Sequence, residues 1–333
     1  MLSVQNAYVE FRVAQTKKWP WSPAGIVHAV NGVSFELEAG RTIGIVGESG
    51  CGKSTLIRAV AGLAPLVSGT VTLDGEQVDY GNRTSMQRLR ATMQMIFQDP
   101  IASLNPRMTI REIVTEPLTF FRPEMGAADR KTAALAMLER VGIPPAQANR
   151  FPHEFSGGQC QRIGIARALV AEPKVLLCDE PVSALDVSIQ AQVVNLLKEL
   201  QREMGLALVF VAHDLGVVRH ISDEVLVMYM GAQMERAPAA DLVRAPQHPY
   251  AKALLSAVPV PDPNIRIAPQ MLEGDLPSPM DLPPGCLFAS RCPHAMAKCI
   301  KARPPMVQRE GHEAACYLLD DASAEQEPCL SDS

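Results

Sequence analysis

The first stretch of the chain with residue types suited to chemistry is a glycine-rich run that carries one lysine and several hydroxyl groups. Residues 47–54 read GESGCGKS and match the pattern GxxxxGK[ST]. Glycines let a backbone turn tightly so that successive N–H groups point at phosphate oxygens, and the helix expected at 54–61 adds a favourable N-terminal dipole. Lys53 is suited to the β- and γ-phosphates of a nucleotide and Ser54 to Mg²⁺. The predicted nucleotide contacts in this run are Gly47, Ser49, Gly50, Cys51, Gly52, Lys53, Ser54 and Thr55.

Two adjacent acids end a predicted strand farther along the chain. The apolar run 174–178 is followed by Asp179 and Glu180. Ligands of open α/β sheets bind at the carboxyl ends of the strands, so both acids are expected beside the phosphate loop. Asp179 is suited to the Mg²⁺ shell and Glu180 to polarising an attacking water. Together with the glycine-rich run, this pair predicts hydrolysis of ATP.

Strand and helix patterns alternate through most of the first 240 residues. The predicted strands are 33–37, 42–46, 71–73, 93–97, 174–178 and 206–212, and the predicted helices include 54–61, 133–141 and 189–200. This alternation indicates an α/β fold with a mostly parallel sheet covered on both faces. Helical spacing over about 100–165 interrupts it and predicts an inserted helical subdomain, in which Ser156 is a helix N-cap.

The composition of the chain changes after about residue 240. Prolines crowd between Pro246 and Pro305, which indicates loops with short helices. We predict an ATPase domain at 1–240 and a small loop-rich C-terminal domain at 241–333. The residues from about 321 onward are polar and are expected to be disordered.

Overall composition limits the classes of function. Of 333 residues, 47% are apolar and 20% are charged, which is ordinary for a soluble globular protein. Acidic residues outnumber basic ones by 36 to 31, giving a formal charge of -5, and no basic tract marks a nucleic-acid surface. The N-terminus lacks the pattern of a signal peptide, and the longest apolar runs are shorter than the roughly 20 residues of a membrane span. Any membrane association is therefore expected to go through a partner.

A further set of motifs carries a resemblance to a known family. Residues 155–159, FSGGQ, resemble the signature LSGGQ of ABC transporter ATPases, with Phe155 in place of the first Leu. Gln98 resembles the Q-loop glutamine of that family, Asp186 its D-loop aspartate and His213 its switch histidine. All these motifs stand in the family's order. Over about residues 1–240 the chain is thus similar to a P-loop ABC nucleotide-binding domain with a RecA-like, mostly parallel sheet.

This resemblance implies a site shared between two such domains that face each other head to tail. ATP lies between the P-loop of one domain and the signature of the other. Outside the P-loop, the implied nucleotide contacts are Ser156, Gly157, Gly158, Gln159 and Asp186. The implied catalytic residues are Glu180, His213 and Gln98. The implied Mg²⁺ ligands are Ser54, Gln98 and Asp179.

An aromatic ring that stacks on adenine is also implied by the family. Phe11, in a strand-like segment upstream of the P-loop, is the predicted residue, and Trp19 and Trp21 are alternatives.

The C-terminal region indicates a subfamily of the ABC transporter ATPases. The run 246–250, PQHPY, and the helical pattern after it resemble the C-terminal signature of oligopeptide and dipeptide importer ATPases, and the match is closest to their second, F-type subunit. The resemblance implies a peripheral subunit on the cytoplasmic face of the cell membrane. It implies as partners a second ATPase (a paralogue or a second copy), two permease subunits and a solute-binding protein, with no nucleic acid. Nickel, glutathione or sugar import remains an alternative, as does a soluble ABC ATPase without a transport role.

Half of the eight cysteines are clustered near the C-terminus, at Cys286, Cys292, Cys299 and Cys316. Thiolates hold iron–sulfur clusters or structural zinc, and the spacing lacks the paired CxxC motifs that are common in zinc ribbons. A similar pattern in peptide-importer ATPases implies a [4Fe-4S] cluster. Zinc and free buried thiols are the alternatives.

Overall fold

The computed structural model describes residues 1–13, 25–257, 277–309 and 311–320. Its contacts divide the chain into two compact units, each assembled from several segments. The first unit comprises 1–3, 36–42 and 71–212, and the second comprises 4–35, 43–70 and 213–333. Both units therefore combine parts that the sequence places far apart, and the division differs in kind from the predicted sequence boundary at residue 240.

Parallel strands form the centre of the first unit. Strand β7 (Val175–Asp179) pairs in parallel with β6 (Met93–Ile96) on one side and with β8 (Ala207–Val211) on the other. Every residue of β7 and β8 is buried, as expected for strands covered on both faces. Helix α2 (Arg83–Thr92) leads into β6, and α6 (Val187–Met204) connects β7 to β8.

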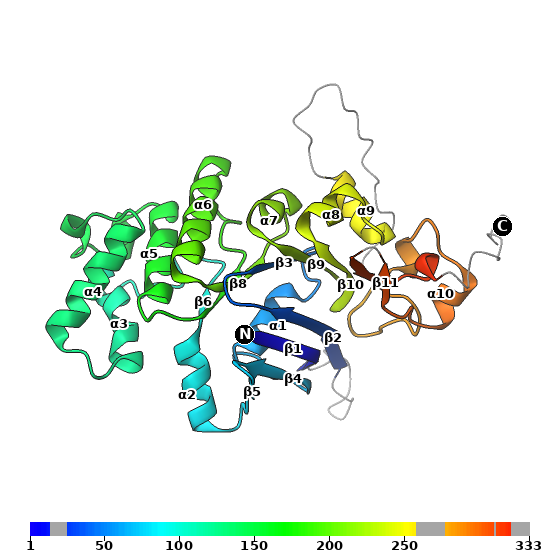
Figure 1. Ribbon diagram of the computed structural model, residues 1–333, viewed down its shortest axis with the longest axis horizontal. Helices are drawn as coiled ribbons and strands as arrows, with labels where there is room; N and C mark the ends of the chain where they lie inside the picture. The colour runs from blue at the N-terminus through cyan, green and yellow to red at the C-terminus, as the bar shows by residue number, and fades with distance from the viewer. Residues whose placement is uncertain (14–24, 258–276, 310, 321–333) are drawn as a thin grey trace, which may run out of the picture. The chain divides into compact units, whose positions relative to one another are not determined.

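A group of helices lies in the chain between β6 and β7. Helix α3 (Ile110–Phe121) packs against both α4 (Ala127–Arg140) and α5 (Gly157–Leu169), as Figure 1 shows. Short 3₁₀ turns, η1 (Pro145–Gln147) and η2 (Pro152–Glu154), connect α4 to α5. The inserted helical subdomain predicted from the sequence is therefore confirmed.

The second unit combines a parallel strand pair with an antiparallel extension. Strand β3 (Thr42–Val46) pairs in parallel with β9 (Glu224–Tyr229), β9 pairs antiparallel with β10 (Ala232–Pro238), and β12 (His312–Ala314) pairs antiparallel with β10 and with β11 (Val307–Arg309). Among its described residues, the α-helices of this unit are α1 (Lys53–Val60), α7 (Leu215–Ile221), α8 (Ala239–Arg244), α9 (Pro249–Ser256) and α10 (Ala297–Lys301).

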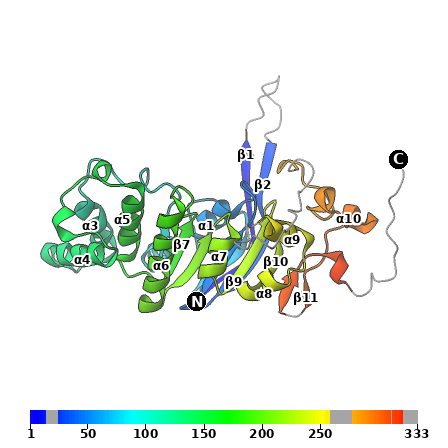
Figure 2. The same cartoon turned by 90° about the horizontal axis from the view of Figure 1, so that it is seen from above.

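Two long strands begin the chain, and the sequence predicts only part of them. Strands β1 (Leu2–Val13) and β2 (Gly25–Leu37) lie side by side (Figure 2). The predicted strand 33–37 is the end of β2. Strand β4 (Ser68–Leu73) forms a short antiparallel pair with β5 (Glu76–Gln77).

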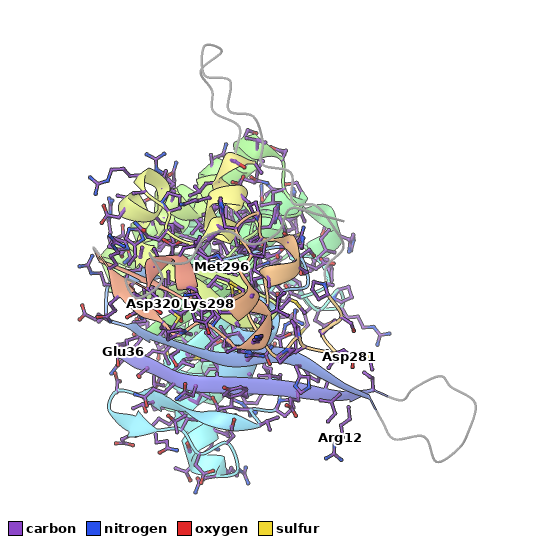
Figure 3. The ribbon with its side chains drawn as sticks, turned by 90° about the vertical axis from the view of Figure 1, so that its right-hand side faces the viewer. Arg12, Glu36, Asp281, Met296, Lys298 and Asp320 are labelled. Atoms are coloured by element: carbon purple, nitrogen blue, oxygen red, sulfur yellow. The ribbon has the colours of Figure 1, made fainter. Side chains whose placement is uncertain are left out.

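The C-terminal part consists mainly of loops with a few short elements. Its short elements are η3 (Ala289–Arg291), α10 (Ala297–Lys301) and η4 (Tyr317–Leu319). Lys298 of α10, labelled in Figure 3, lies over the ring of Tyr317 at 4.7 Å. No helix in the described ranges has both the length and the apolar character needed to cross a membrane. The predicted disordered tail and the alternative adenine contacts Trp19 and Trp21 lie outside the described residues.

Candidate functional site

The predicted phosphate loop is a turn between the buried strand β3 and helix α1, and it belongs to the second unit. Gly52 precedes the helix with φ +101°, and a Cβ there would stand 2.2 Å from the carbonyl oxygen of Ala29. No side chain caps the N-terminus of α1. Its first N–H groups therefore remain available to an anion, in the arrangement that P-loops use for phosphate.

Lys53 is folded back over its own loop. Its ammonium group donates to the carbonyl oxygens of Gly47 at 2.8 Å and Glu48 at 3.0 Å, and the residue is almost fully buried. The thiol of Cys51 is also buried, and burial raises its pKa above the ordinary value. The cation therefore lies inside the turn, where it is suited to phosphate oxygens.

The acid pair belongs to the first unit. Asp179 ends β7 and is fully buried. Glu180 has φ +45°, a left-handed conformation that is strained for a residue with a side chain, and its N–H donates to the carbonyl of Val211 at 3.1 Å. Its Oε2 accepts a hydrogen bond from the Gln98 side chain at 3.0 Å. The structure thus brings Gln98 and Glu180 into contact, although 82 residues separate them.

The signature segment begins helix α5 and caps it with its own side chains. Ser156 Oγ accepts from the Gln159 N–H at 3.4 Å, and the Gln159 side-chain oxygen accepts from the Ser156 N–H at 3.0 Å. This reciprocal arrangement is a capping box. The predicted N-cap at Ser156 is therefore confirmed. Gly158 packs so closely that an added Cβ would lie 2.6 Å from Ile189 Cγ2.

The remaining predicted residues are at element ends or on exposed positions. Asp186 caps α6, and the hydroxyl of Ser188 followed by the N–H of Ile189 holds the pKa of its carboxyl below the ordinary value. His213 is exposed and follows β8. Phe11 is 37% exposed on β1 and is therefore accessible for stacking.

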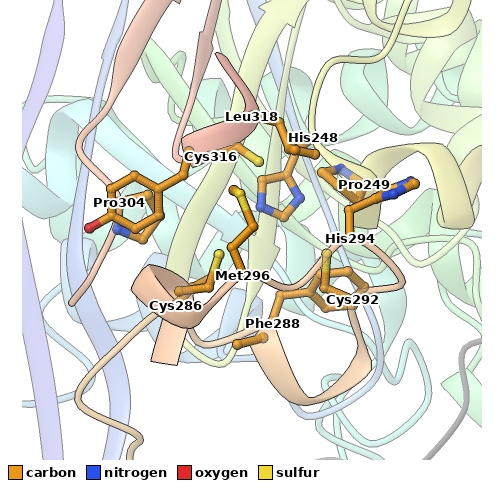
Figure 4. A pocket seen from close by; sticks show the side chains of 13 residues that line it. His248, Pro249, Cys286, Phe288, Cys292, His294, Met296, Pro304, Cys316 and Leu318 are labelled. Atoms are coloured by element: carbon orange, nitrogen blue, oxygen red, sulfur yellow. The ribbon is translucent and has the colours of Figure 1, made fainter. Parts of the chain in front are cut away.

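The clustered cysteines line one cavity within the second unit (Figure 4). The cavity is bordered by Cys286, Cys292, Cys299, Cys316, His248, His294 and Met296, among others. Burial is the main cause of the raised pKa values of Cys286, Cys292 and Cys316, the last of which rises to about 11, and neighbouring thiols add to each shift. The four cysteines that the sequence analysis singled out therefore border one cavity.

The structure gives no direct support to a metal in that cavity. Within the part of the chain that the structure describes, no three His, Cys, Asp or Glu side chains are arranged to hold a metal ion. Cys286, Cys292, Cys299 and Cys316 are free cysteines. Among the described residues, neither the predicted [4Fe-4S] cluster nor the zinc alternative is therefore supported by a set of metal ligands.

The PQHPY segment packs its ring side chains into the second unit. The His248 Nδ1 accepts from the Tyr250 N–H at 3.0 Å and so caps α9, while the buried carboxylate of Glu235 accepts from the His248 N–H at 2.8 Å. Burial lowers the pKa of His248 to about 4, which keeps the ring neutral and able to accept. Tyr250 packs against Tyr229 and Phe288 at ring-centroid distances of 4.8 and 5.3 Å.

Sequence reasoning passed over several residues that contact the phosphate loop. Tyr250 was a subfamily marker without a role, yet its hydroxyl accepts from the Glu48 N–H at 2.9 Å. The guanidinium of Arg291 donates to both carboxylate oxygens of Glu48. The one sequence signal for this contact is the charge of Glu48, which occupies the first variable position of GxxxxGK[ST]. A charged residue there implies a partner of opposite charge in another part of the chain.

Comparisons with known proteins agree with this arrangement. The family described as ABC transporter matches residues 30–183, and the family described as oligopeptide/dipeptide transporter, C-terminal region, matches residues 234–299. The oligopeptide transport ATP-binding protein OppF of Salmonella typhimurium is 52% identical over 322 residues, which is 96% of each chain. The putative oligopeptide transport ATP-binding protein YkfD of Bacillus subtilis is 49% identical over 303 residues, 90% of this chain and 92% of its own.

Among solved structures, the ATP-binding cassette MJ0796, in a dimeric post-hydrolysis state bound to ADP and Pi, matches with a TM-score of 0.63 and 29% identity. The match covers 72% of this chain and 99% of that one. Its coverage and the motif order agree with the predicted fold class. The chain belongs to the ABC transporter family, and within it to the oligopeptide transport ATP-binding proteins.

Proposed function

We propose that this chain binds and hydrolyses ATP to drive the import of oligopeptides or dipeptides through partner permease subunits. The observation that carries the proposal is the phosphate loop itself, an uncapped helix N-terminus with a buried lysine inside the turn, in a chain whose similarity to OppF extends over 96% of its length. The matching C-terminal region supports a peptide solute.

Each residue of the loop has a proposed task in nucleotide binding. Lys53 holds the β- and γ-phosphates, and the backbone N–H groups from Gly50 to Thr55 cradle them. Ser54 and Asp179 provide a hydroxyl and a carboxylate, the hard oxygen ligands that Mg²⁺ prefers, and Gln98 adds an amide oxygen. When bound, Mg²⁺ neutralises developing charge on the phosphates. Phe11 supports the adenine ring by stacking.

Hydrolysis requires a group that orients the attacking water. Glu180 is the proposed base, since its carboxylate is held by Gln98 and its strained backbone is fixed by hydrogen bonds. Strain of this kind concentrates at functional sites, because the surrounding structure must overcome it. His213 is proposed to stabilise charge on the γ-phosphate.

A second ATPase subunit completes the proposed site. The signature residues Ser156, Gly157, Gly158 and Gln159, with Asp186, are proposed to contact the nucleotide of the facing subunit, and the dimeric, ADP- and Pi-bound state of MJ0796 supports such an assembly. The facing subunit is a paralogue or a second copy. Further proposed partners are two permeases and a solute-binding protein, and the chain is proposed to act as a peripheral subunit on the cytoplasmic face of the cell membrane.

The cysteine cavity is proposed to hold a [4Fe-4S] cluster. Its four thiols converge from separate segments on one cavity, and each thiolate of such a cluster binds a different iron, so the sulfurs do not need to meet at one point. Anaerobic purification followed by iron and sulfide analysis tests this. Iron and acid-labile sulfide in equal amounts support the cluster, zinc alone supports the alternative, and neither leaves free thiols.

Peptide uptake provides the direct test of the main proposal. A panel of labelled di- to pentapeptides is offered to host cells that carry either the wild-type chain or Glu180→Gln and lack other peptide importers. Loss of uptake with the variant supports both the ATPase role and the peptide solute. Uptake no higher than in host cells without the chain, with both proteins present in equal amounts, contradicts the peptide solute and directs the same assay to nickel, glutathione or sugars. Equal uptake above that level contradicts the role proposed for Glu180.

A further inference from the structure

The phosphate loop is joined to the cysteine-rich region by an ion pair. Arg291 Nη1 donates to the two carboxylate oxygens of Glu48 at 3.0 and 2.9 Å. The Arg291 side chain is 9% exposed and that of Glu48 is 22% exposed, so water screens the pair only in part. Both residues belong to the second unit, although 243 positions separate them.

Every polar group of Glu48 has a partner within the same unit. Its N–H donates to the hydroxyl of Tyr250 at 2.9 Å, its carbonyl accepts from Lys53 at 3.0 Å, and its carboxylate accepts from Arg291. Residue 48 directly follows Gly47, at the start of the turn. Its position therefore influences the path of the backbone whose N–H groups are proposed to bind phosphate.

Arg291 is itself held by a rigid setting. It ends the 3₁₀ turn η3, which lies between Cys286 and Cys292, and its N–H donates to the carbonyl of Phe288 at 3.0 Å. Phe288 is fully buried and packs edge-on against Tyr229 at 5.4 Å. The guanidinium lies 5.9 Å from the centre of the Tyr229 ring. The aromatic cluster thus fixes the turn from which Arg291 reaches the loop.

We propose that Arg291 is a positioning residue for nucleotide binding, which acts through Glu48 and makes ATP affinity depend on the turn between Cys286 and Cys292. A loop already held in its binding shape loses less conformational freedom when a ligand arrives, so affinity rises without any new contact to the ligand. This inference rests on the proposed ATP-binding function. It adds to nucleotide binding a residue outside the known motifs. It also assigns Tyr250, which contacts Glu48, to the group of residues that hold the loop.

The test compares nucleotide affinity and turnover in matched variants of the full chain. A fluorescent ATP analogue reports the dissociation constant, and the assembled transporter reports KM and kcat for ATP. Arg291→Met is expected to raise the dissociation constant and KM roughly tenfold, since a hydrogen-bonded charge pair is lost at a partly screened site. The value of kcat at saturating ATP stays within about twofold, because Arg291 touches no reacting atom.

Matched controls separate positioning from general stability. Arg236→Met removes another partly buried ion pair of the same unit, the one with Glu313 at 3.0 Å, and is expected to leave affinity unchanged. Arg291→Lys keeps the charge and should recover most of the lost affinity. Glu48→Gln should also lower nucleotide affinity. The double variant of Glu48→Gln with Arg291→Met should have an affinity no lower than that of the single variant that binds less tightly, because both substitutions break the same ion pair. Glu48→Gln also serves as the test if Arg291→Met does not fold.

The inference is overturned if Arg291→Met and Glu48→Gln bind the analogue as tightly as the wild type, if Arg236→Met loses as much affinity, or if the two single effects multiply in the double variant. A wild-type chain that binds no ATP overturns the proposed function and this inference together. Wild-type binding with unaffected variants overturns the inference alone.

Discussion

The phosphate loop and the signature segment are both glycine-rich turns that begin a helix, yet different contacts hold them. Local contacts hold the signature, because the side chains of Ser156 and Gln159 each accept a hydrogen bond from the other residue's backbone N–H and so cap α5. The loop has no side-chain cap on α1 and is held by partners from distant segments, including Tyr250 and Arg291. An uncapped helix end is open to a ligand, whereas a capped one is already partly satisfied. Distant partners therefore hold the loop in place of a local cap, which agrees with its proposed role in phosphate binding.

The largest effect is expected from a variant that impairs ATP hydrolysis and leaves nucleotide binding unchanged. Glu180→Gln removes the proposed base of the first unit and should lower ATP turnover by about 10²- to 10⁴-fold. The loop of the second unit is untouched, so affinity for the ATP analogue should stay within about twofold. Steady-state hydrolysis by the assembled transporter and equilibrium binding to the purified chain measure the two quantities.

Lys53→Met is the complementary variant. It keeps Glu180 but removes the cation of the loop, so nucleotide binding itself should fail. Turnover near the wild-type rate in Glu180→Gln would contradict the role assigned to that carboxylate.

A smaller effect is expected from adding one methyl group to each turn. Gly52→Ala places a Cβ at φ +101° and 2.2 Å from the Ala29 carbonyl oxygen, so the loop must change its path. Strain of about 1–3 kcal/mol corresponds to a loss of nucleotide affinity of roughly 5- to 150-fold.

Gly157→Ala in the signature is the matched variant. The nearest atom to its Cβ is Leu185 Cδ2 at 3.8 Å, an ordinary contact, so the single chain should bind the analogue as the wild type does. Equal losses in both variants would show that the two turns do not differ in the way described.

Two serine substitutions test the difference in helix capping between the two turns. The measured quantity is the free energy of unfolding, not nucleotide affinity. Ser156→Ala removes the side-chain acceptor of the capping box and should lower the free energy of unfolding by about 1 kcal/mol. Ser49→Ala, in the exposed part of the loop, removes a hydroxyl that caps no helix and should leave stability within about 0.5 kcal/mol. Urea denaturation of the two variants and the wild type gives the comparison, and a loss at Ser49 as large as at Ser156 would refute it.

The sequence predicts those parts of the site that depend on local spacing. The loop, the two acids at the end of β7 and the capped signature are each defined by a few consecutive residues, so their elements are identified to within a few positions. The contact of Gln98 with Glu180 follows from the parallel pairing of β6 and β7, since both residues come just after paired strand ends.

Contacts between distant segments are the part that sequence patterns miss. Nothing near Glu48 indicates that its partner is Arg291, because the pairing depends on how the cysteine-rich turn packs on Tyr229 and Phe288. The long N-terminal strands were also predicted only in part, since the segment from Gly25 alternates weakly in polarity. Tertiary packing decides both features.

The thiol of Cys51 offers a test of whether the loop keeps its closed shape in solution. The side chain is buried, and burial raises the pKa of the thiol above its ordinary value of 9.0. Alkylation requires the thiolate, so at any pH below that pKa a raised value means less thiolate and slower reaction. The rate at Cys51 should therefore still be rising with pH at pH 9, where an exposed cysteine is already approaching its maximum rate. Peptide-resolved mass spectrometry after timed alkylation measures the rate for this cysteine alone. A rate that levels off as it does for an exposed cysteine would mean that the loop opens. The same measurement on Arg291→Met should show faster reaction that levels off in this way if the ion pair holds the loop in place.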